Sequence, residues 1–207
     1  MEVLRRSILA ALLLVTSLYR LNGQNEAALQ AAFKESYTME SIRKFPEAIA
    51  ALTKVYEEKS YELNLRIGWL YYLNKDYQQS QVYYQRAVNL KPYAIEAKLG
   101  LSQPLAALQY TDKLLQLYED VLKIDALHSV ANYWAGVIHY NRRKYEDASK
   151  HFEKVVNLYP FDYDGNHMLA WTYLNLGRSN DAKILFNKAL LAKPGDASCL
   201  DGLSKIK

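Results

Sequence analysis

The chain has 207 residues, which is enough for one domain with a continuous core. Half of the residues are hydrophobic and 23% are charged, so the composition predicts a folded chain and excludes intrinsic disorder. Without Glu2, Arg5, Arg6 and Arg20 of the N-terminal segment, 23 basic and 21 acidic residues leave a net charge of +2. That charge is too small to predict nucleic-acid binding.

The counts of individual residue types point to a helical protein. Eight Gly and five Pro argue against a β-rich protein, and 18 Tyr suit half-buried helix faces and binding surfaces.

The first 23 residues have the order of a secretory signal. A short basic segment covers residues 1–6, a mainly apolar segment covers residues 7–19, and small or polar residues follow. An apolar run of 13 residues is too short to span a hydrocarbon core of about 30 Å comfortably. We expect cleavage after Gly23, as in signals of Gram-negative bacteria, which this segment resembles. An uncleaved membrane anchor is the alternative, and either one predicts a periplasmic or secreted protein of the bacterial cell envelope.

The single cysteine, Cys199, cannot form an intrachain disulfide. The sequence predicts that Cys199 is a small buried side chain, because free cysteine is among the most buried residue types. Pairing with a cysteine of a partner protein is the alternative in an oxidising compartment.

A period of 34 residues organises the chain from about residue 27 to residue 196. Each copy holds two apolar helical stretches, separated by a polar break and closed by a proline in three copies. The positions that recur in the clearest copy are Gly68, Tyr71, Tyr77, Ser80, Tyr84, Ala87 and Pro92. Their small, aromatic and closing-proline positions resemble those of the tetratricopeptide repeat (TPR).

The resemblance implies an all-α fold, a right-handed superhelical solenoid of about five helix-turn-helix units. The expected repeats span residues 27–60, 61–94, 95–128, 129–162 and 163–196, within one solenoid domain over residues 24–207. Residues 197–207 are expected to form a capping helix, with Leu200, Leu203 and Ile206 on one face and charged residues elsewhere.

Two features depart from the family pattern. Asn64, Asn132 and Asn166 stand where the first helix often carries Trp, and either hydrogen-bond between neighbouring helices or lie half exposed. Pro104 falls inside an expected first helix, where it should kink or break that helix. Such a kink is either a tolerated irregularity or a bend that reshapes the inner surface.

The sequence contains no catalytic constellation. The four histidines lack metal-ligand spacing, and neither a Gly-rich phosphate loop nor a Gly-x-Ser-x-Gly elbow is present. We therefore expect a protein that is not an enzyme, with no cofactor and no metal.

The first helices of TPR units line the concave surface, so the resemblance implies which side chains face a groove. These side chains are mainly aromatic, and aromatic anchors dominate binding energy at interfaces. The groove residues projected in this way are Phe33, Tyr37, Trp69, Tyr72, Gln103, Tyr133, Val137, Tyr140, His167 and Trp171. The alternative interpretation is that several of these rings pack against neighbouring helices and leave little free surface. We expect the most exposed of them to be Trp69, Tyr72, Tyr140 and Trp171.

The sequence thus predicts an exported adaptor or scaffold that holds an extended or helical segment of a partner protein in an aromatic groove. The alternative is a structural component of an envelope complex, bound through its convex face or its ends. A lesser alternative is an aromatic cradle for glycan. Fold alone does not decide among these three functions.

Overall fold

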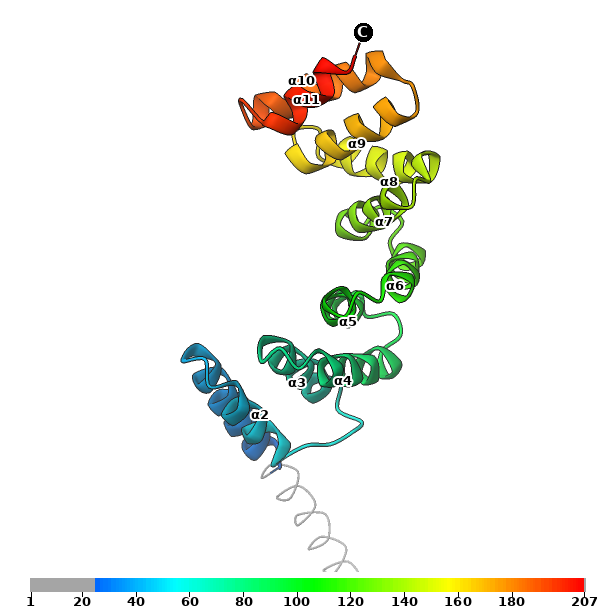
Figure 1. Ribbon diagram of the computed structural model, residues 1–207. Coiled ribbons are helices and arrows are strands. Elements are labelled where there is room, and N and C mark those ends of the chain that lie inside the picture. The colour runs from blue at the N-terminus through cyan, green and yellow to red at the C-terminus, as the bar shows by residue number, and fades with distance from the viewer. Residues whose placement is uncertain (1–24, 207) are drawn as a thin grey trace, which may run out of the picture. The chain divides into compact units, whose positions relative to one another are not determined.

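A computed structural model describes residues 25–206 as a series of α-helices joined by short turns (Figure 1). No strand occurs in residues 25–206, which confirms the predicted all-helical fold class. The chain divides into two compact units, one ending at Pro104 and the other beginning at Leu105. The predicted signal, residues 1–23, lies outside the described residues. Within 25–206 there is no helix that is both long and apolar enough to cross a membrane.

The first unit is built from helix pairs that share an apolar core. Its helices are a helix over residues 25–41, α2 (Phe45–Thr53), α3 (Tyr61–Leu73), α4 (Tyr77–Leu90) and most of α5 (Ile95–Ala107). Buried Ala32, Leu52, Leu63, Ile67 and Leu70 hold the helix over residues 25–41, α2 and α3 together. These apolar positions recur every three to four residues, so each helix turns one stripe toward its neighbours.

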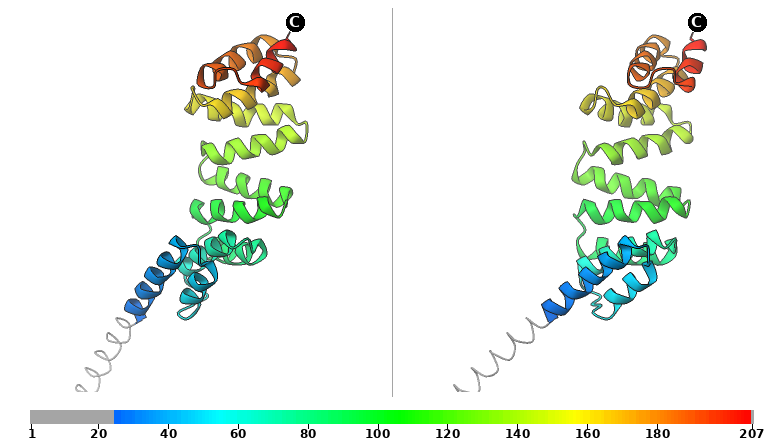
Figure 2. Two further views of the ribbon diagram at one scale, coloured as in Figure 1. Left: turned by 60° about the vertical axis from the view of Figure 1, so that its left-hand side comes forward. Right: turned by 90° about the vertical axis from the view of Figure 1, so that its left-hand side faces the viewer.

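The second unit repeats the same scheme, and adjacent helices lie side by side in both views of Figure 2. Its helices are α6 (Thr111–Ile124), α7 (Ser129–Asn141), α8 (Tyr145–Leu158), α9 (Tyr163–Asn175), α10 (Ser179–Ala192) and α11 (Ala197–Ser204). The paired helices α7 and α8 contact one another closely, as do α9 and α10, while α11 packs against both α9 and α10.

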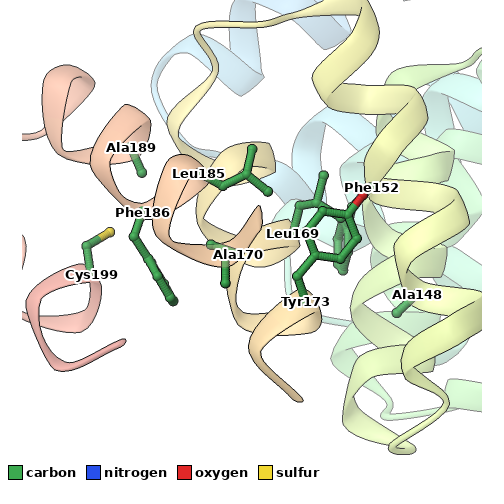
Figure 3. Packing of buried hydrophobic residues seen from close by; sticks show 10 residues of the cluster. Ala148, Phe152, Leu169, Ala170, Tyr173, Leu185, Phe186, Ala189 and Cys199 are labelled. Atoms are coloured by element: carbon green, nitrogen blue, oxygen red, sulfur yellow. The ribbon is translucent and has the colours of Figure 1, made fainter. Parts of the chain in front are cut away.

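Large rings fill the space left by small residues where helices cross. Phe152 of α8 is fully buried, and a Cβ atom added at Gly136 of α7 would lie 2.8 Å from Cε1 of its ring. A Cβ at Gly202 of α11 would overlap the ring of Phe186. Figure 3 shows Phe186 with Ala189 and Cys199, which belong to the same buried cluster. Glycine is therefore required at these crossings because the neighbouring ring occupies the volume of a side chain.

The turns inside successive repeats share one backbone conformation. Lys75, Gln109, Arg143 and Gly177 stand 34 residues apart, and their φ angles lie between 58° and 76°. This left-handed conformation favours glycine, yet only Gly177 is one. The turns between repeats instead end in side-chain caps, as where Asp162 Oδ2 accepts a hydrogen bond from Gly165 N at 2.6 Å.

The three repeated asparagines are fully buried and tie each first helix to the turn before it. Asn132 Nδ2 donates to the carbonyl oxygens of Ala126 and His128 at 3.1 Å, and Asn64 and Asn166 make the equivalent pair of bonds. The half-exposed alternative is therefore wrong. The bond between helices that the sequence suggested exists at Asn132, whose Oδ1 lies 3.0 Å from Nδ1 of His151 in α8.

We expect His151 to make the protein less stable in acid. Its burial, reinforced by the stacked ring of His139, lowers the pKa of His151 from 6.5 to about 4. The pKa of His151 is lower in the folded chain than in the unfolded chain, so the neutral imidazole contributes to the free energy of unfolding. This contribution is complete above about pH 6.5 and is lost as the pH falls through 4. The loss amounts to at most about 3 kcal/mol. Urea unfolding between pH 7.5 and pH 4 measures it.

The variant His151→Leu is the control for this pH dependence. It should be less stable at pH 7.5, because Asn132 Oδ1 loses its partner, but its stability should fall less steeply below pH 6.5. An unchanged slope in this variant would assign the acid sensitivity to other groups, such as His139, whose pKa burial also lowers.

Pro104 does not break its helix. The helix α5 continues from Ile95 to Ala107, and the side chain of Pro104 is fully buried, so the predicted break is wrong. Gly100, four residues earlier, lies directly against Tyr84 of α4, where a Cβ atom would overlap the ring. Pro104 instead marks the place where the first compact unit ends.

Candidate functional site

The first unit contains a cavity of about 810 Å³ beside the helix over residues 25–41, α3, α4 and α5. Four of the five groove residues that the sequence predicted for this unit line it, namely Phe33, Tyr37, Trp69 and Gln103. The other lining residues are Tyr61, Glu62, Leu65, Arg66, Tyr84, Glu96, Leu99 and Gly100. The cavity is thus mainly aromatic and aliphatic, with a few charged groups, which is the usual make-up of a ligand-binding pocket.

A buried ion pair fixes the aromatic wall of this cavity. Arg66 is only 8% exposed, and its Nη2 lies 2.5 Å from Oε2 of Glu40. The other oxygen of Glu40 accepts a hydrogen bond from Trp69 Nε1 at 2.7 Å. One carboxylate therefore holds both the guanidinium and the indole, so the orientation of Trp69 is set before any ligand arrives.

Tyr37 stacks on the other side of the same guanidinium. Its ring centroid lies 3.8 Å from Cζ of Arg66, a cation–π contact, while Arg66 Nε donates to Ser36 Oγ at 3.0 Å. Tyr37 is nevertheless 56% exposed, which leaves one face of its ring available. The sequence prediction missed Arg66. Its position between Leu65 and Ile67, in the middle of an apolar helix, was the signal that could have identified it as a buried charge.

Tyr72, the fifth predicted residue of this unit, lies behind the cavity. Its ring stacks on Trp69 with centroids 5.8 Å apart and also contacts Tyr77. Tyr72 and Trp69 are both partly buried, so neither is as exposed as the sequence suggested. Tyr72 supports the position of Trp69.

Acidic groups border the cavity. Glu96 Oε2 accepts a hydrogen bond from Tyr61 Oη at 3.1 Å, and burial together with this bond raises the pKa of Tyr61 to about 12. A hydrogen bond from its own backbone amide, with a smaller contribution from Lys91, lowers the pKa of Glu62. Glu40 neutralises Arg66, and Lys91 lies 3.3 Å from Oε1 of Glu62, so Glu96 leaves the border negatively charged at neutral pH.

The second unit has a smaller cavity of about 290 Å³ between α7 and the turn that follows α8. It is lined by Ser129, Val130, Tyr133, Trp134, Val155, Tyr159, Asp162 and Asp164. Of the five groove residues predicted for this unit, only Tyr133 lies here, packed edge-on against Trp134 and Phe152. Burial raises the pKa of Tyr133, and the nearby Asp164 and Asp162 add to the shift. This border is also acidic.

The sequence prediction missed the most exposed apolar residues of this cavity. Trp134 is 45% exposed, Val130 46% and Tyr159 54%. Projection from the family pattern selected Tyr133 and Val137, which are both partly buried, and passed over the adjacent Trp134. The signal was available, because a Trp, a Val and a Tyr near one repeat junction are unusual on a solvated surface.

The remaining predicted residues of the second unit pack between helices. Tyr140 accepts a hydrogen bond from Asn175 Nδ2 at 3.2 Å. Trp171 meets the ring of Phe186 edge-on, and its Nε1 donates to Ser198 Oγ at 3.1 Å. His167 stacks on Tyr163 with centroids 5.4 Å apart. All are partly buried and none lines the smaller cavity, so the strong exposure expected of Tyr140 and Trp171 is wrong.

Three models of the tetratricopeptide repeat match the sequence, at residues 61–93, 130–162 and 151–184. A comparison with curated proteins found no match.

Solved TPR structures superpose on most of the chain. The crystal structure of MamA has a TM-score of 0.72 at 17% identity, covering 82% of this chain and 94% of its own. YrrB, described as a TPR protein with an unusual peptide-binding site, has a TM-score of 0.73 at 15% identity, with 90% and 97% covered. A TPR protein from Parabacteroides merdae has a TM-score of 0.75 at 17% identity, with 87% and 72% covered. The chain therefore contains tetratricopeptide repeats at the matched residues and has the fold of a TPR solenoid.

Proposed function

We propose that this protein is an exported adaptor that holds a segment of a partner protein on its aromatic surfaces. The observation that carries the proposal is the cavity of the first unit, where Glu40 fixes both Arg66 and Trp69 beside the exposed ring of Tyr37. Aromatic side chains that are already oriented bind at a small entropic cost. TPR proteins bind proteins or peptides, and the YrrB structure is described as having a peptide-binding site, which supports the same class of function.

The charges at both cavities suggest which segments would bind. Glu62 and Glu96 border the cavity of the first unit, and Asp162 and Asp164 border that of the second. We expect the partner segment to carry an aromatic or aliphatic side chain next to Lys or Arg, so that the ring enters the cavity and the cation meets the carboxylates. Binding should then weaken with added salt, because the carboxylates at the border are screened.

Site-specific photo-crosslinking tests the adaptor proposal. A photoreactive phenylalanine replaces Tyr37, which lines the cavity, or Tyr93, a control that is more exposed, at 84%, and does not line it. We expect a discrete protein adduct in the native envelope from position 37 and none from position 93. The adduct should be reduced at least tenfold by Trp69→Ala, because aromatic anchors carry much of the energy of an interface.

The alternative, a structural component bound through another face, also has a specific observation in its favour. Ile184 and Leu191 lie seven residues apart on one face of α10 and are 66% and 72% exposed. Adducts from position 184 together with none from position 37 would replace the adaptor proposal with this one. Binding of purified cell-wall fragments in the absence of any protein would indicate a glycan cradle.

A further inference from the structure

Three side chains with metal-binding atoms meet at the C-terminal end of the second unit. A ring nitrogen of His167, a carboxylate oxygen of Asp196 and Sγ of Cys199 all lie within 4.8 Å of one another. His167 belongs to α9, while Asp196 and Cys199 belong to the start of α11. The three side chains therefore join the last helix to the helix pair on which it packs. They lie outside both aromatic cavities.

The local fold places the two ligands of α11 on one turn. Asp196 is the N-cap of α11, and its Oδ1 accepts a hydrogen bond from Cys199 N at 3.0 Å. This Asp-x-x-Cys arrangement fixes the carboxylate over the first turn, so that its oxygens lie near Sγ. Cys199 is fully buried and faces Phe186 of α10, which restricts its side chain (Figure 3).

The imidazole of His167 is held from two sides. Its ring stacks on Tyr163, and Nε2 lies 2.8 Å from Ser198 Oγ and 3.2 Å from Trp171 Nε1. A ligand histidine commonly donates its other ring N–H to a neighbouring oxygen. Ser198 Oγ is that acceptor when Nε2 of His167 carries the proton, and it also accepts from Trp171 Nε1 at 3.1 Å, so Nδ1 is the nitrogen with a free lone pair. The ring therefore needs little rearrangement to act as a ligand.

We propose that His167, Asp196 and Cys199 bind one Zn²⁺ ion that fastens α11 to α9. One nitrogen, one oxygen and one sulfur ligand suit Zn²⁺, which takes all three atom types at about 2.0–2.3 Å in tetrahedral geometry. Ligand atoms around such an ion lie roughly 3.3–3.8 Å apart, so the most distant pair closes by at most about 1.5 Å. Water completes the fourth position.

The charges balance at this site. The thiol proton is released to water as the Zn–S bond forms, and a neutral imidazole, one carboxylate and one thiolate then offset the two charges of Zn²⁺. Lys193, which lies 2.9 Å from Oδ2 of Asp196, is 60% exposed and can turn to solvent when the metal takes its place. We expected no metal from the sequence, because the ligands come from separate helices and no short spacing connects all three.

Titration of the full reduced chain with Co²⁺, followed by Zn²⁺, tests the proposal. Co²⁺ bound by a thiolate gives a charge-transfer absorption band, so we expect one equivalent to bind with this band and one equivalent of Zn²⁺ to remove it. Cys199→Ser should abolish the band, and His167→Gln and Asp196→Asn should each weaken Co²⁺ binding at least tenfold.

Asp162→Asn is the matched control. Asp162 caps α9 in the same way, but Gly165 stands where α11 has Cys199, so this variant loses a cap without losing a ligand. It should bind Co²⁺ as the parent does. Circular dichroism verifies that each variant is folded, and the thermal midpoint of the unaltered chain provides a measurement that needs no variant. That midpoint should rise with Zn²⁺ concentration.

Two results would overturn the site. One is the absence of the band at equimolar Co²⁺ together with a thermal midpoint that Zn²⁺ does not raise. The other is a band that His167→Gln and Asp196→Asn leave unchanged, since binding would then involve the thiol alone. Neither result bears on the photo-crosslink at position 37, so the zinc site and the adaptor proposal can fail separately.

Discussion

We expect Phe152→Ala to lower the free energy of unfolding by about 3–5 kcal/mol. The ring is fully buried and fills the space beside Gly136, which has no side chain of its own to fill it. Its removal therefore leaves a cavity as well as removing apolar contacts. Urea unfolding monitored by circular dichroism measures the change.

Phe161→Ala is the control for this prediction, because Phe161 is 63% exposed and its loss should cost less than about 0.5 kcal/mol. A cost below about 1 kcal/mol for Phe152→Ala would mean that the helices collapse onto the vacated space. The packing between Phe152 and Gly136 would then not be the rigid contact described above.

The second large effect concerns the buried ion pair of the first unit. Glu40→Ala leaves the guanidinium of Arg66 buried without its carboxylate, and breaking such a pair costs about 3–5 kcal/mol. Because Glu40 is 22% exposed and water can partly replace it, we expect the lower end of this range. Thermal or urea unfolding of the variant measures the loss.

The double variant Glu40→Leu/Arg66→Met separates charge burial from packing. Replacing a buried pair with apolar side chains of similar size is often nearly neutral, so the double variant should recover most of the stability that Glu40→Ala loses. It should still bind the partner segment poorly, because Trp69 Nε1 loses its acceptor and Tyr37 loses its cation. Equal losses for the single and double variants would contradict this account.

The fold could be predicted from the sequence because its signature residues have a direct physical role. Gly68 and Gly136 recur where helices cross, and Tyr84 and Phe152 recur as the rings that fill the crossing. Those positions repeat with the period of the unit, so a single chain shows them several times. The turns were less visible, since Lys75 and Arg143 adopt a left-handed conformation without being glycine.

The candidate sites could be predicted only in part. Projection from the family pattern identified Phe33, Tyr37 and Trp69, because residues on one face of a helix follow from helical spacing. It could not identify Glu40 as the partner of Arg66, since that pair joins two helices with unrelated spacing. Similarly, no local pattern connects His167 with Asp196 and Cys199, which meet only when α11 packs on α9.

The hydrogen bonds between neighbouring repeats have a consequence for how the chain acquires its structure. Tyr61 bonds Glu96 and Tyr140 bonds Asn175, and each pair is separated by 35 residues. Contacts this local close only short loops, so folding should be fast for a protein of this length and can begin at more than one place. A chain that emerges gradually from one end can therefore fold unit by unit, before its last residues are available.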